Sequence, residues 1–181
     1  PPSQANFENA LAVDIMKKAD FAPDRHLFFE DESRMVGPRT IPVHMWRSMS
    51  EATIAVVDMP LEFRIERVLQ EYVIEMLQEH IDEDTDNGPE NYRQQSLASL
   101  FRIRKRLGSE KYAKLETIMK TAINEQLASG NTSSHHGWIE PLLTDYYDPM
   151  YEYQLSSKSE RVVFSGDYQQ VQEWARHQRY K

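Results

Sequence analysis

Short apolar segments alternate with amphipathic helical segments along this chain, and that alternation constrains the fold more than any other feature. The clearest apolar segment is residues 53–57 (T-I-A-V-V), which is β-branched or apolar through its centre and predicts a buried strand. Residues 27–29 (L-F-F) and 161–164 (R-V-V-F) predict two more short strands. Because strands that alternate with helices form parallel sheets with crossover connections, the pattern predicts an α/β fold with flanking helices.

Apolar residues at helical spacing predict the helices around these strands. Residues 4–18 carry one such stripe, with Ser3 as N-cap, and further helices are predicted at 43–50 and 168–176. Pro60 opens another helix. Its apolar stripe consists of Leu61, Ile65, Val68, Leu69, Tyr72 and Met76.

A block of helices without strands separates the second and third apolar segments. Helices are predicted at 92–107, at 109–127 after Gly108, and at 138–153 on both sides of Pro149. We therefore expect an α/β portion at residues 1–80 and 158–181, and a helical subdomain inserted at residues 81–157.

Composition excludes several classes of protein. The 181 residues include no cysteine, which excludes a disulfide framework, a thiolate metal site and a cysteine nucleophile within this sequence. No apolar run approaches the roughly 20 residues that span a bilayer. We expect a cytoplasmic protein without a membrane partner. Because the sequence begins Pro1-Pro2-Ser3 rather than with methionine, we also expect a processed chain or a fragment.

The formal net charge of −8 is unevenly distributed. Residues 68–90 contain eight acids and no lysine or arginine, whereas residues 102–120 contain seven lysines and arginines and two acids. One interpretation is two differently charged, solvated helix faces. The other is a nucleic-acid surface, since clustered basic residues bind phosphates even on an acidic protein.

Several segments along the chain are informative when they are taken together and in order. They are S-Q-A-N-F-E-N at 3–9, E-D-E-S-R-M-V-G at 30–37, A-V-V at 55–57, R-I-E-R at 64–67, E-Y at 71–72, R-K-R-L-G at 104–108, P-L-L at 141–143, Y-Y-D-P-M-Y at 146–151 and V-V-F at 162–164. Over residues 3–174, this ordered set resembles the bacterial tRNA 2-selenouridine synthase family. The ordered set is specific, above all Y-Y-D-P-M-Y.

The resemblance implies a rhodanese-type domain with an essential cysteine, followed by a P-loop domain with a Walker A sequence. This chain resembles only the part downstream of Walker A, that is, a partial P-loop NTPase-like parallel sheet lacking its first strand. The resemblance also implies a transferase that replaces sulfur by selenium on the wobble 2-thiouridine of tRNA. The implied co-substrates are selenophosphate and geranyl diphosphate, with an S-geranylated intermediate. The partners would then be the tRNA anticodon region and the rhodanese domain, and not DNA. On its own, this piece would be inactive.

Three acids follow the first apolar segment, and an arginine follows them. If residues 27–29 form a parallel strand, Asp31, Glu32 and Glu30 lie at the sheet edge where P-loop folds hold Mg²⁺. Arg34 is a candidate for bidentate contact with a diphosphate. The structural alternative is that Arg34 pairs with one of these acids and Ser33 caps a turn.

Arg64 and Arg67 lie three residues apart on the helix after Pro60, so both guanidinium groups lie on nearly the same face. A diphosphate leaving group, which the resemblance implies, requires such cations. The alternative is pairing with Glu62, Glu66 or Glu71 on the same helix.

Two segments are candidates for tRNA contact. The cationic run, defined as Arg102, Arg104, Lys105 and Arg106, offers four cations within two helical turns, enough for salt-dependent phosphate contacts. The alternative is a helix face paired with the acids at 82–86. Tyr146, Tyr147 and Tyr151, with Tyr153 beside them, can stack an unpaired base or line a groove for the geranyl chain. Here the alternative is tyrosines in the core.

Two other classes of function remain open from the residues alone. A small-molecule kinase of the nucleoside or nucleotide type has the same strand–helix order and arginine placement. A non-catalytic interaction module could be built on residues 90–155.

Overall fold

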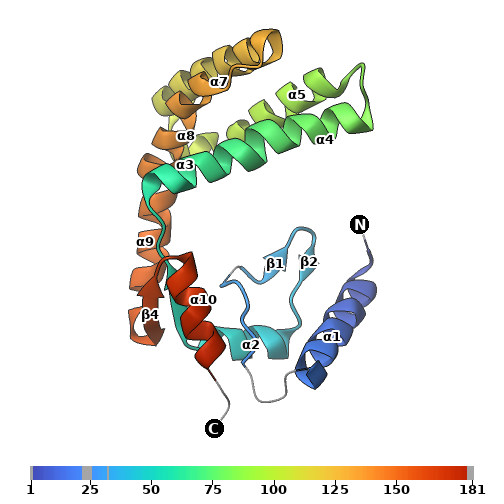
Figure 1. Cartoon of the computed structure of the whole chain (residues 1–181), viewed down its shortest axis with the longest axis vertical. Helices are drawn as coiled ribbons and strands as arrows, with labels where there is room; N and C mark the ends of the chain where they lie inside the picture. Colours follow the sequence, from blue (N-terminus) through green and yellow to red (C-terminus); the bar gives the residue numbers. More distant parts are fainter. Residues whose placement is uncertain (1, 22–25, 32, 179–181) are drawn as a thin grey trace. The chain divides into compact units, whose positions relative to one another are not determined.

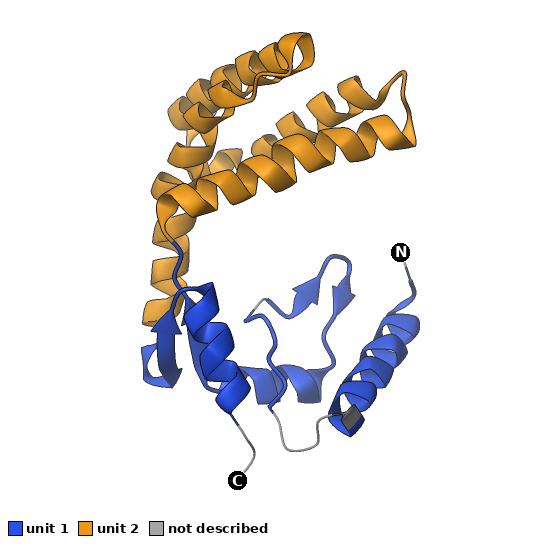
Figure 2. Cartoon of the chain, viewed as in Figure 1, with its two compact units in different colours: residues 1–59, 158–181 blue, residues 60–157 orange. Residues whose placement is uncertain are grey.

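The computed structural model describes residues 2–21, 26–31 and 33–178, with the side chain of Phe21 outside this description. The chain forms two compact units, Pro1–Met59 with Lys158–Lys181, and Pro60–Ser157 (Figure 2). The division falls at Pro60 rather than near residue 81, where the sequence placed it. The reason is that Ile65, Leu69 and Val73, from the helix after Pro60, are buried in the core of the second unit.

The second unit is helical and confirms the helices predicted between residues 60 and 156. Its elements are α3 (Leu61–Leu69), the π-helical η1 (Gln70–Glu75), α4 (Met76–Glu83), α5 (Gly88–Arg102), α6 (Arg104–Leu107), α7 (Ser109–Ser129), the 3-10 turn η2 (Ser133–His135), α8 (His136–Leu142), the π-helical η3 (Leu143–Tyr147) and α9 (Asp148–Ser156). Figure 1 shows α3 and α4 as one continuous rod, as η1 joins them. The predicted helix at 92–107 divides at Ile103, whose backbone leaves helical geometry (φ −95°, ψ 1°).

A buried polar network lies in the core of this unit. Gln126 on α7 donates from Nε2 to the carbonyl oxygen of Val73 in η1 at 3.0 Å, and its Oε1 accepts a hydrogen bond from the Tyr92 hydroxyl at 3.1 Å. Burial raises the pKa of Tyr92 to about 12, so this hydroxyl keeps its proton. The π-helical geometry of η1 is thus tied to α5 and α7 by side-chain hydrogen bonds.

His135 is buried in the same unit and makes its stability depend on pH. Its Nδ1 accepts a hydrogen bond from Trp138 Nε1 at 2.9 Å, and burial lowers its pKa from 6.5 to about 4. The unfolded chain therefore binds more protons than the folded chain between pH 6.5 and 4. We expect stability to fall by about 3 kcal/mol as pH drops through this range.

Urea unfolding at several pH values measures this effect. His135→Gln keeps an acceptor for Trp138 and should lose that part of the pH dependence, whereas His136→Gln, at the neighbouring half-buried position, should retain it. Identical pH dependence in the two variants would contradict the role of His135.

The first unit is a small α/β assembly. It contains α1 (Gln4–Phe21), β1 (Met35–Val36), β2 (Arg39–Thr40), α2 (Val43–Glu51), β3 (Ile54–Val57), the 3-10 turn η4 (Ser159–Arg161), β4 (Val162–Gly166) and α10 (Tyr168–His177). β3 and β4 pair in parallel, as predicted, and β1 and β2 form an antiparallel hairpin that turns at Gly37 (φ +56°). The Ser3 hydroxyl accepts from the backbone N–H of Asn6 at 3.2 Å, which confirms the predicted N-cap.

The strand predicted at residues 27–29 is absent. These residues have no strand partner in the described chain, and Phe28 instead meets Trp174 of α10 edge to face, with ring centroids 5.9 Å apart. The physical reason is that a strand requires a neighbouring strand for its backbone hydrogen bonds. The fold is accordingly mostly helical with a small parallel sheet. Within the described ranges, no helix is long and apolar enough to cross a bilayer.

Candidate functional site

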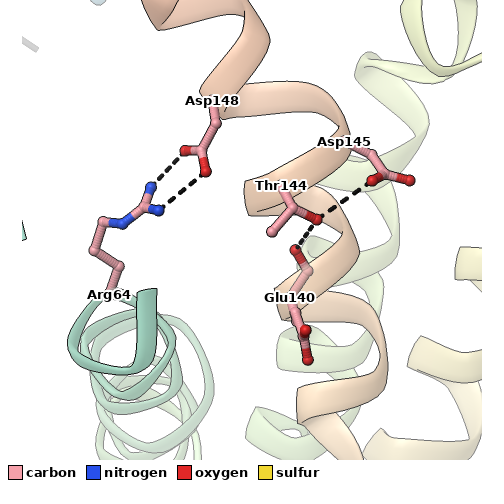
Figure 3. Close-up of polar contacts among 5 residues, drawn as sticks. All are labelled: Arg64, Glu140, Thr144, Asp145 and Asp148. Carbon is pink, nitrogen blue, oxygen red and sulfur yellow. Dashed lines mark hydrogen bonds and ion pairs between the residues drawn. The ribbon is translucent and has the colours of Figure 1, made fainter. Parts of the chain in front are cut away.

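The centre of the candidate site is an ion pair between two helices of the helical unit (Figure 3). Arg64 on α3 contacts the Asp148 carboxylate with both terminal nitrogens, Nη1 to Oδ1 and Nη2 to Oδ2, the latter at 3.0 Å. The two side chains are 34% and 26% exposed, so the pair is partly shielded from water. Bidentate, charge-assisted contacts are the strongest of their kind, and this one ties α3 to the start of α9.

The residues that precede Asp148 form the π-helical segment η3. Thr144 Oγ1 lies 3.0 Å from the carbonyl oxygen of Glu140 and 3.3 Å from Asp145 Oδ1 (Figure 3). Asp145 in turn pairs with Lys111 of α7 at 3.2 Å. π-Helical turns are frequent at functional sites because they reorient side chains within a helix. Here η3 carries Asp145 and two of the tyrosines predicted to contact tRNA.

The predicted tyrosines form one aromatic cluster. Tyr146 and Tyr147 meet edge to face with centroids 4.9 Å apart, and Tyr147 stacks on Tyr151 at 6.4 Å. Tyr147 also packs against the hydrophobic core, and burial raises its pKa. Tyr151 is 57% exposed. The inner ring, Tyr147, thus packs as the core alternative expected, the outer ring of Tyr151 faces solvent, and base stacking on this cluster stays a prediction.

The cationic run lies at the junction between α5 and α6. Arg102, Lys105 and Arg106 are exposed and Arg104 is half-buried. Within the described part of the chain, no carboxylate lies within ion-pair distance of any of the four, so the expected alternative of pairing with the acids at 82–86 is not formed. Arg106 Nη1 instead lies 3.4 Å from the Tyr146 hydroxyl and donates to it. This contact brings together two segments that the sequence identified separately.

The structure gives the predicted diphosphate-binding arginines different surroundings. Arg67 pairs with Glu71 on the same helix at 2.6 Å, as the structural alternative expected, while Arg64 contacts Asp148, 84 residues away. Arg34 belongs to the other unit, where its carbonyl oxygen accepts from the backbone N–H of Ile41. Sequence reasoning did not select Asp148. Its position inside Y-Y-D-P-M-Y was the only available signal.

The predicted magnesium ligands lie in the first unit. Because residues 27–29 form no strand, Glu30 and Asp31 do not follow one, and Asp31 pairs with Lys158 at 2.5 Å. Glu32 lies outside the described residues. Among residues 2–21, 26–31 and 33–178, no three His, Cys, Asp or Glu side chains form a group that could hold a metal ion. Magnesium binding by these acids stays a prediction. Ser33 Oγ accepts from the backbone N–H of Met35 at 3.2 Å, the turn-capping role expected as its alternative.

Comparisons with known proteins agree on one family. The family model described as the tRNA 2-selenouridine synthase AAA domain matches residues 1–181. Curated relatives named tRNA 2-selenouridine synthase include that of Photobacterium profundum, 41% identical over 95% of this chain and 47% of the relative. Another is that of Marinobacter nauticus, 43% identical over 97% of this chain and 48% of the relative.

The chain thus spans about half the length of the curated relatives it matches. No solved structure matches it significantly. The relatives' names favour the synthase over the alternative of a small-molecule kinase. The sequence, through its AAA-domain match, belongs to the tRNA 2-selenouridine synthase family.

Proposed function

We propose that this chain supplies a tRNA-binding surface to an enzyme that replaces sulfur by selenium on the wobble 2-thiouridine of tRNA. In the proposed reaction the thiouridine sulfur is first alkylated by geranyl diphosphate, which releases diphosphate. The selenium of selenophosphate then attacks the carbon that carries the geranylated sulfur, geranylthiol leaves, and water cleaves the selenium–phosphorus bond to release phosphate. The chain contains no cysteine, so the thiol chemistry belongs to a rhodanese-type part of the whole enzyme.

The contact between Arg106 and Tyr146 carries the proposal for tRNA. It places the cationic run beside the tyrosine cluster, two segments separated by 40 residues. Cations without carboxylate partners in the described chain are suited to phosphates, and tyrosine rings are suited to unpaired bases. The combination fits a structured RNA with a single-stranded loop better than it fits duplex DNA. We therefore assign the anticodon stem–loop to this surface.

Diphosphate binding by Arg34, Arg64 and Arg67 is a separate part of the proposal. The pair between Arg67 and Glu71 is solvent-exposed, with the Arg67 side chain 64% exposed. Breaking this pair so that Arg67 can bind a phosphate instead therefore costs little free energy. Arg64 is held by both oxygens of Asp148, and a diphosphate would compete with that carboxylate. Arg67 is thus the arginine of α3 best suited to a transient ligand.

Binding of the 181-residue chain to RNA at several salt concentrations tests the tRNA proposal. We expect an anticodon stem–loop containing 2-thiouridine to bind at least about tenfold more tightly than the base-paired stem alone, because only the loop offers unpaired bases. The logarithm of the binding constant should fall with the logarithm of salt concentration with a slope of about −3, as expected for four phosphate contacts. Equal affinity for stem and stem–loop, or a slope near zero, would contradict the proposal.

A further inference from the structure

An exposed phenylalanine lies next to the cationic run. Phe101 is the last residue but one of α5 and directly precedes the cationic run, yet its side chain is 48% exposed. Its neighbours Leu100 and Ile103 pack into or against the hydrophobic core, so the helix already has its apolar contacts at this end. Packing in the core therefore does not account for Phe101.

The backbone break at Ile103 places an arginine over this ring. The Arg104 guanidinium carbon lies 3.5 Å from the centroid of the Phe101 ring, and Arg104 Nη1 donates to the Phe101 carbonyl oxygen at 2.9 Å. A guanidinium that lies over an aromatic ring and is also hydrogen-bonded has little freedom to move. Arg104 is thus oriented by two contacts rather than moving as a flexible surface cation.

A second aromatic ring fixes Phe101 from the side. Tyr112 of α7 meets Phe101 edge to face, with centroids 6.1 Å apart. The Tyr112 hydroxyl donates to Glu116 Oε1 at 2.6 Å, and this hydrogen bond raises the pKa of Tyr112. The phenylalanine and arginine are consequently ordered before any ligand binds, which lowers the entropy cost of binding.

We propose that Phe101 and Arg104 form a stacking platform for an unpaired nucleobase of the bound RNA. Aromatic faces and guanidinium planes are the two side-chain surfaces on which single-stranded bases stack, and here they occur as one ordered unit among phosphate-binding cations. The inference rests on the proposed function of this surface, and it adds a base contact to the phosphate contacts of the cationic run.

The test uses the 181-residue chain and an anticodon stem–loop that carries 2-aminopurine at each unpaired position in turn. Stacking quenches this fluorescent base, so wild-type protein should change its emission at one position. Phe101→Leu should abolish that change and weaken binding by about 5- to 30-fold. The salt dependence should stay the same, because no phosphate contact is lost.

Matched variants separate stacking from a general loss of structure or charge. Phe63→Leu makes the same substitution at a 51% exposed position of α3 and should leave both affinity and fluorescence unchanged. Arg104→Lys keeps the charge but removes the planar guanidinium, and it should reduce the quenching at the same position.

Two negative results have different meanings. If wild type and Phe101→Leu bind and quench alike, the platform is wrong while the tRNA-binding proposal stands. If the wild-type chain does not bind the stem–loop at all, the proposed function fails and the platform fails with it.

Discussion

Replacing all four residues of the cationic run by glutamine should weaken binding to the anticodon stem–loop by about 100- to 1000-fold at low salt, and should flatten the salt dependence of binding. The run is Arg102, Arg104, Lys105 and Arg106, none of which has a carboxylate partner within the described chain. Each cation that contacts a phosphate releases a counterion when it binds, so loss of all four removes most of the electrostatic free energy. Fluorescence anisotropy across a salt series measures both quantities.

A control with the same net charge shows whether the effect depends on position. Glutamine at Lys17, Lys18, Arg47 and Arg176 also removes four exposed cations, but from the α/β unit. Both variants change the formal net charge from −8 to −12, because each removes four positive charges. If the control loses as much affinity as the cationic-run variant, net charge rather than this surface governs RNA binding.

Disrupting the ion pair between Arg64 and Asp148 should cost about 2 kcal/mol of folding free energy. Asp148→Asn keeps the shape of the side chain but leaves the half-buried Arg64 guanidinium facing a neutral amide. A fully buried pair would cost about 3–5 kcal/mol when broken, and the expectation here is lower because water still reaches both side chains. Urea unfolding followed by circular dichroism measures this change.

A second ion pair on the same helix supplies the control. Arg67 and Glu71 pair in the i,i+4 arrangement, with side chains 64% and 38% exposed. A double-mutant cycle with Arg67→Met and Glu71→Gln should give a coupling of about 0.3–0.5 kcal/mol. The cycle with Arg64→Met and Asp148→Asn should give about 1–2 kcal/mol. Similar couplings for the two pairs would show that Arg64 and Asp148 contribute no more than a surface contact.

The helices could be predicted from the sequence because their signals are local. The apolar stripe at Ile65, Leu69 and their neighbours repeats at helical spacing, and Ser3 precedes its helix as an N-cap does. The strands β3 and β4 were predictable for a similar reason, since both are short β-branched segments. The segment 27–29 (Leu-Phe-Phe) is likewise short and apolar, but it has no strand partner among the described residues, and composition alone does not supply one.

The candidate site could be predicted only in part. Arginines and tyrosines with the right chemistry were visible in the sequence, because residue type and spacing are enough to identify a cation cluster or an aromatic cluster. Asp148 was not selected, because Arg64, the residue with which it pairs, lies 84 residues away on another helix. Phe101 was not selected as a site residue, because its helical spacing with Leu97 and Leu100 indicates a core position until its exposure is known.

By itself, the sequence determined the family, the helices of the second unit and the two parallel strands, since these depend on local periodicity and on ordered motifs. Only the tertiary structure decided which charges are paired and which lack carboxylate partners in the described residues. Arg64 is held by Asp148, whereas Arg106 donates a hydrogen bond to Tyr146. The physical reason is that a side chain's partners are set by how helices distant in sequence pack together, and no local pattern encodes that packing.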